Sequence, residues 1–83
     1  MDPRRTFAII NLAWLAIEER QFRQAIELCS RAILVEPTYA KAYEKRARAY
    51  LEMGDQTRAL ADWRIARELV ASGRDTSDID LSE

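Results

Sequence analysis

The chain repeats its own pattern of small residues once, at a spacing of 34 residues. Three alanines of the first half return in the second, as the pairs Ala13 and Ala47, Ala25 and Ala59, and Ala32 and Ala66. Bulky positions keep the same frame, as Ile26 and Leu60 do. A fixed period of about this length is typical of a two-helix unit that stacks on its neighbours. Because such units present a surface and rarely carry chemistry, the repeat favours a binding module over an enzyme.

Size and composition predict one small all-α domain. A chain of 83 residues is too short for more than one domain of ordinary size. Proline and glycine occur twice each, and good helix formers such as alanine, leucine, arginine and glutamate dominate. The net charge of −1 argues against general nucleic-acid binding, so we expect no nucleic-acid partner.

The sequence offers little for catalysis, for a cofactor or for a membrane. It contains no histidine and one cysteine, Cys29, so we expect neither a metal site nor another cofactor. Neither a glycine-rich phosphate loop nor a nucleophile with a plausible base is found, so the chain is not expected to be an enzyme. Without a long apolar run or a signal-peptide core, we expect a cytoplasmic protein with no membrane partner.

Local signals predict four helices, over residues 2–19, 21–35, 39–53 and 56–71. Pro37 ends the second helix, and Thr38 is expected to cap the third. Gly54 supplies the positive φ that ends the third helix, and Asp55 is expected to cap the fourth. The fourth helix is expected to bury Ala59, Leu60, Trp63, Ala66, Leu69 and Val70.

Short turns predict two antiparallel helix hairpins stacked in chain order within one domain, residues 1–71. The first repeat covers about 6–39 and the second about 40–71, while 72–83 is polar and acidic and is expected to be a flexible tail. Arg20 stands where Gly54 stands in the second copy, which predicts that the first turn is either strained or differently shaped.

The second copy is more polar than the first at three positions where a further repeat would pack. There the residues Leu12, Phe22 and Ile33 of the first copy are replaced by Arg46, Gln56 and Arg67. Since terminal repeats need a wettable outer face, this indicates a sequence adapted to being the last unit.

The residues that recur resemble those of the tetratricopeptide repeat family. In the second copy they are Ala40-Lys41-Ala42-Tyr43, Ala47, Tyr50, Gly54-Asp55, Ala59, Trp63 and Ala66, and the first copy matches more loosely. The resemblance covers residues 6–71 and implies a right-handed superhelical stack that binds a partner protein, as a scaffold or a co-chaperone does.

The resemblance also implies a concave groove lined by the first helix of each hairpin. Carried onto this sequence, the groove residues are Phe7, Ile10, Asn11, Trp14, Lys41, Lys45 and Arg48. Some members of the family grip a C-terminal carboxylate, and Asn11, Lys41 and Lys45 match three places of that clamp. The expected partner is therefore another protein or peptide, such as one with an acidic C-terminus, although the clamp is partial because a preceding repeat is missing.

The groove residues on the first helix also have a simpler interpretation. Core packing or self-association is favoured over a peptide pocket for Phe7, Ile10 and Trp14, and the Asn11 side chain can point to solvent or back to its own helix.

Other interpretations stay open. The basic stripe Lys41, Lys45 and Arg48 also fits an ordinary solvated helix face. The nearly all-round apolar character of the first helix suggests a module that self-associates as a homodimer, with no separate peptide ligand. The acidic tail can also fold back onto the basic stripe. DNA binding through the third helix is weaker, because Glu44 and Glu52 interrupt the positive patch.

Overall fold

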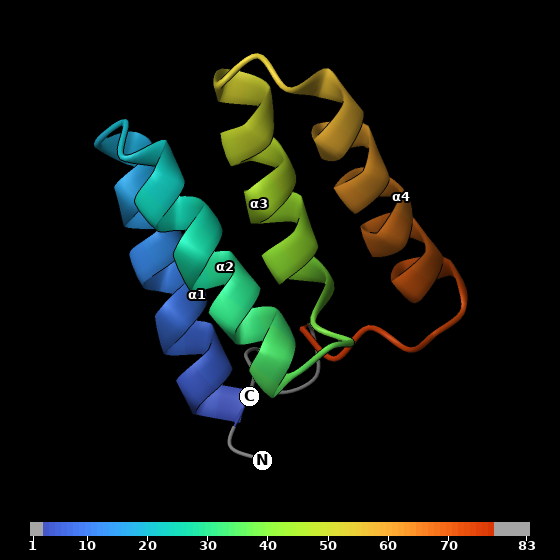
Figure 1. Cartoon of the computed structure of the whole chain (residues 1–83). Helices are drawn as coiled ribbons and strands as arrows, with labels where there is room; N and C mark the ends of the chain where they lie inside the picture. The colour runs from blue at the N-terminus through green and yellow to red at the C-terminus, as the bar shows by residue number, and fades with distance from the viewer. Residues whose placement is uncertain (1–2, 78–83) are drawn as a thin grey trace.

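The computed structural model describes residues 3–77, and within them four α-helices follow one another (Figure 1). They are α1 (Pro3–Glu18), α2 (Phe22–Val35), α3 (Ala40–Glu52) and α4 (Gln56–Ala71). The bounds agree with the predicted ranges to within a residue or two. Asp2, expected to cap the first helix, lies outside the described residues.

The helices pack as two antiparallel hairpins, α1 against α2 and α3 against α4. The hairpins meet where α3 packs against α2, and α3 also touches α1. In Figure 1 the first hairpin lies on one side of α3, and α4 lies on the other. The all-α fold and the stacked hairpins predicted from the period are therefore confirmed.

Small alanine side chains are buried in the interior of the stack. The six alanines of the repeat are all buried, at 0–3% exposure, and they are Ala13, Ala25, Ala32, Ala47, Ala59 and Ala66. A methyl side chain lets two helix axes approach closely, while larger neighbours fill the spaces around the contact. The period seen in the sequence is thus a period of buried small residues.

The two hairpin turns differ in the way the sequence predicted. Arg20 adopts φ 61° in the first turn, where Gly54 adopts φ 86° in the second. The left-handed region is costly for a residue with a Cβ and almost free for glycine. The first turn therefore carries backbone strain that the second turn avoids.

The two helices of the second hairpin are capped differently. Asp55 caps α4 as predicted, because its carboxylate accepts a hydrogen bond from the Arg58 amide at 3.1 Å. The prediction that Thr38 caps α3 is wrong. The amide of Ala40, the first residue of α3, instead donates to the Asp75 carboxylate at 3.0 Å. The cap of α3 thus comes from the segment that follows α4.

This segment, residues 74–77, runs back to the start of α3. The Thr76 amide donates to the Thr38 carbonyl at 2.9 Å, and the two threonine hydroxyls lie 3.2 Å apart. Ser77 is buried, and its amide and hydroxyl both donate to Asp75. The first part of the predicted flexible tail therefore makes defined contacts, and residues 78–83 lie outside the described residues.

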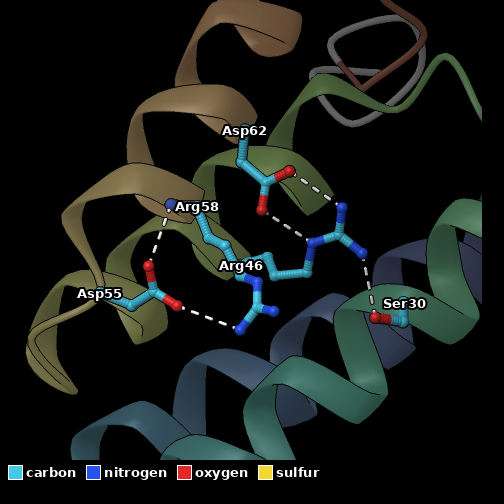
Figure 2. Close-up of polar contacts among 5 residues, drawn as sticks. All are labelled: Ser30, Arg46, Asp55, Arg58 and Asp62. Carbon is cyan, nitrogen blue, oxygen red and sulfur yellow. Dashed lines mark hydrogen bonds and ion pairs between the residues drawn. The ribbon is translucent and has the colours of Figure 1, made fainter.

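Arg46 joins three helices at the junction of the two hairpins (Figure 2). From α3 its guanidinium donates to both oxygens of Asp62 on α4, at 2.8 and 2.9 Å, and to the Ser30 hydroxyl on α2 at 3.0 Å. The side chains are 21% exposed for Arg46 and 5% for Asp62. The interpretation of Arg46 as part of a wettable end face is therefore wrong, since the residue is interior to the stack.

Replacing Arg46 with alanine should lower the free energy of unfolding by about 3 kcal/mol, because it leaves the buried Asp62 carboxylate without its counter-charge. The double variant Arg46→Leu/Asp62→Leu places leucine at both positions, as the first repeat does with Leu12 and Leu28. Its free energy of unfolding should lie within about 1 kcal/mol of the wild-type value. Urea titrations followed by circular dichroism measure both.

The matched control is Arg58→Ala, which removes the exposed ion pair with Asp55 on the same hairpin (Figure 2). Exposed pairs contribute little, so this variant should lose no more than about 0.5 kcal/mol. Equal losses for Arg46→Ala and Arg58→Ala would contradict a special role for the junction.

Asp75→Ala should cost about 1 kcal/mol, because it removes the cap of α3. Burial opposes ionisation of Asp75, but the hydrogen bonds from Ser77 and Ala40 and the charge of Lys41 outweigh it, and the pKa lies below the ordinary 3.8. A lowered folded-state pKa adds stability above the ordinary pKa, and this stability is lost as the pH falls. The difference between wild type and variant should thus be present at about pH 7 and shrink towards about pH 3. A difference independent of pH would argue against an ionised cap.

Candidate functional site

Two rows of side chains on neighbouring helices make up the face that the sequence singled out. Phe7, Asn11 and Trp14 on α1 precede Lys41, Lys45 and Arg48 on α3 by one repeat each. Because α1 and α3 are the corresponding helices of the two hairpins and touch each other, the two rows lie on the same side of the stack. One row is aromatic and amide, and the other is cationic.

Most of these residues reach the surface. Phe7 and Trp14 are 38% and 47% exposed, Asn11 and Arg48 are also exposed, and the two lysines are partly exposed. Ile10 is the exception. At 4% exposure it lies in a core cluster with Ala13 and Cys29, so it supports the face from beneath and offers almost no surface to a partner.

The end of this face near the helix C-termini is hollowed. Ile17 and Glu18 of α1 line a hollow of about 220 Å³ together with Arg48 and Glu52 of α3. Arg48 donates to Glu52 at 3.2 Å, one helical turn away, and its side chain is 60% exposed. An exposed pair of this kind stabilises the helix little, so Arg48 can exchange Glu52 for another carboxylate at small cost.

At the other end of the face, α3 already has a carboxylate beside it. Asp75 bonds the first amide of α3, and the charge of Lys41 helps to lower the pKa of that carboxyl group. The N-terminal end of α3 therefore accommodates an anion from an extended segment of chain. A cationic row next to exposed aromatic side chains can hold an acidic, extended peptide by charge-assisted hydrogen bonds and apolar contact.

A second surface, which sequence reasoning missed, lies at the end of the stack. It is a hollow of about 830 Å³ that crosses from Glu44 of α3 to α4, where Leu60, Trp63, Arg64, Ala66, Arg67, Val70 and Ala71 line it. The prediction that Leu60 and Val70 are buried is wrong, since they are 54% and 56% exposed. Periodicity identified their helix face correctly, but in the described residues no further helix covers that face.

The opposite end of the stack is also apolar. Leu12 and Leu15 of α1 are 55% and 49% exposed. Ala8, about one helical turn before Leu12, is also exposed. The 34-residue period is the sequence signal from which both exposed ends could have been located. A residue whose counterpart one repeat away is covered by a neighbouring hairpin is exposed when it belongs to a terminal hairpin.

Cys29 is a packing residue, as expected from its place on the inner face of α2. It is completely buried, and burial raises the pKa of its thiol to about 12. Reactive cysteines need an accessible thiolate, so this one is chemically inert in the folded state.

A family model described as a tetratricopeptide repeat matches residues 28–61. The match begins in the second half of α2, includes all of α3 and ends in α4. Together with the period, the four helices are consistent with about two such repeats, and domains of this kind generally mediate protein–protein interaction. None of the helices in the described range is both long and apolar enough to cross a bilayer.

Proposed function

We propose that this chain is a protein-interaction module, not an enzyme, and that it holds a segment of a partner protein along the face formed by α1 and α3. The observation that carries the proposal is the pairing of an exposed aromatic and amide row with a cationic row on adjacent, equivalent helices. The tetratricopeptide match at 28–61 supports it, because that fold generally binds proteins.

The chemistry of the face favours a segment that ends in acidic residues and a free carboxylate. Asn11 supplies an amide donor, and Lys41 and Lys45 supply positive charge from the facing helix. Lysine acts as a point charge and does not fix a carboxylate in two-pronged geometry. We therefore propose a moderately selective grip, closer to charge attraction than to a rigid clamp.

Self-association is a second candidate function. It is favoured by the exposed apolar side chains of α1, which include Leu12, Trp14 and Leu15 at 55%, 47% and 49% exposure. A monomer of this size seldom exposes so many large apolar side chains on a single helix without a partner for them.

The peptide proposal predicts that Lys41→Ala/Lys45→Ala weakens binding of an acidic peptide about tenfold or more. The probe is a synthetic eight-residue peptide with four acidic residues at a free C-terminal carboxylate. Fluorescence of Trp14 reports its binding in a Trp63→Phe background, which removes the signal from the far end of the stack. Raising the salt concentration should weaken binding in wild type more than in the variant.

The matched control is Arg23→Ala/Arg31→Ala, which removes the same charge from the exposed side of α2 and should leave affinity within about twofold. The same peptide with an amidated C-terminus measures the contribution of the terminal carboxylate. Equal weakening by the two double variants would show attraction to net charge alone and would remove the assignment to this face.

A further inference from the structure

We infer that the two ends of the stack bind each other between copies of this chain, with α1 of one copy seated in the hollow on α3 and α4 of the next. This inference rests on the second candidate function and gives it a defined interface. It uses different residues from the peptide-binding face, so the two proposals are tested by different variants.

The template for this contact is inside the chain, where α3 of the second hairpin is seated on the first. Ala42 shares a buried cluster with Cys29 and Ala32 of α2. One turn further along α3, Arg46 bonds Ser30 of α2. Ala49 continues the contact in a second buried cluster, which includes Ala25 of α2 with Ile26 packed against it.

On α1 the counterparts of these α3 residues, one repeat earlier, are Ala8, Leu12 and Leu15. In α3 Ala42 and Ala49 are fully buried, whereas all three counterparts on α1 are exposed. The helix face that α3 uses to sit on its neighbour therefore exists on α1 in a more apolar form, and no described residue covers it.

The hollow at the other end has the same correspondence to the seat on the first hairpin. Residues Ile10, Ile26, Cys29, Ser30, Ala32 and Ile33 of that seat become, one repeat later, Glu44, Leu60, Trp63, Arg64, Ala66 and Arg67. All six of these later residues line the hollow of about 830 Å³. The hollow therefore lies where the first helix of a further repeat would pack.

Transferring the internal contact to two copies brings apolar residues together. Ala49 packs in one cluster with Ile26, so Leu15 of one copy faces Leu60 of the next. Arg46 reaches Ser30, so Leu12 faces the aliphatic stem of Arg64 beside Trp63. Leu15 is larger than Ala49, its counterpart in the internal contact. The hollow at the other end supplies room for it and for Leu12.

The charges at the ends of the stack also agree with this pairing. Tyr39 and Ile10 lie in the same buried cluster of the internal contact. Their counterparts across the proposed contact are Arg5 and Glu44, both exposed and opposite in charge. An apolar pair is thereby replaced by an ion pair at the rim, which favours one register of the two copies.

The described part of the chain turns away from the hollow instead of covering it. Gly73 adopts φ 75°, and the following residues are tied to the start of α3 through Asp75 and Thr76. A contact between the two unlike ends is heterologous, so it does not close at a dimer and builds a row of copies.

Sedimentation velocity over a range of concentrations tests the inference with three forms of the chain. Wild type should grow past a dimer as concentration rises. Leu12→Glu/Leu15→Glu disables the α1 end, and Glu44→Arg/Leu60→Glu disables the α4 end. Each variant alone should lose about tenfold or more of the association constant. An equimolar mixture should form a one-to-one heterodimer and nothing longer, because one good end of each kind remains.

Leu34→Glu is the matched control, since Leu34 is 83% exposed on α2 and belongs to neither end; it should associate like wild type. Arg5→Glu combined with Glu44→Arg should recover association lost in either single charge reversal. A wild type that stays monomeric overturns both self-association and this interface. A wild type that associates while the mixture of end variants stays monomeric overturns the head-to-tail contact alone, and neither result bears on the peptide test.

Discussion

The close approach of helices through alanine is the contact on which the rest of this structure depends. The buried alanines lie at the same positions of both hairpins, and larger side chains there would push the helices apart. α3 packs against α2 as well as against α4, so contacts between helices join the two hairpins as well as the helices within each hairpin. The proposed peptide face and the two ends of the stack follow from that regularity.

Alanine contacts have a consequence for stability, because each buries little apolar area. Hydrogen bonds and an ion pair between elements distant in sequence add to the stability of the stack. Arg46 connects α2, α3 and α4 through Ser30 and Asp62, and Asp75 fastens the segment after α4 to the first turn of α3. The stack of two hairpins is therefore stabilised partly by hydrogen-bond networks, and removing one partner leaves the remaining polar groups unsatisfied.

The sequence predicted those features that depend on near neighbours along the chain. Pro37, Gly54 and Asp55 act within one turn of their own position, so the helix bounds and the cap of α4 were predictable. The cap from Asp75 and the burial of Arg46 were not, because each depends on a partner that only the folded chain brings near.

The candidate surfaces were also only partly predictable from local sequence patterns. Periodicity predicts which side of a helix is apolar, but whether that side is covered depends on the number of repeats. Leu60 and Val70 are on the apolar side of α4 and exposed, because in the described residues nothing lies beyond them. Ile10 shows the converse, since a position carried over as a groove residue is buried by α2 and α3.

The two proposed surfaces are geometrically independent, and that independence has a functional consequence. The peptide face uses one side of α1 and α3, whereas the end contact uses the flanks of α1 and α4. In a head-to-tail row, α1 of one copy would lie beside α3 of the next, as α3 lies beside α1 within the chain. The aromatic row with Phe7 and Trp14 and the cationic row with Lys45 would then alternate along a continuous face. A ligand that spans several copies would gain affinity by effective concentration, without any new contact within one copy.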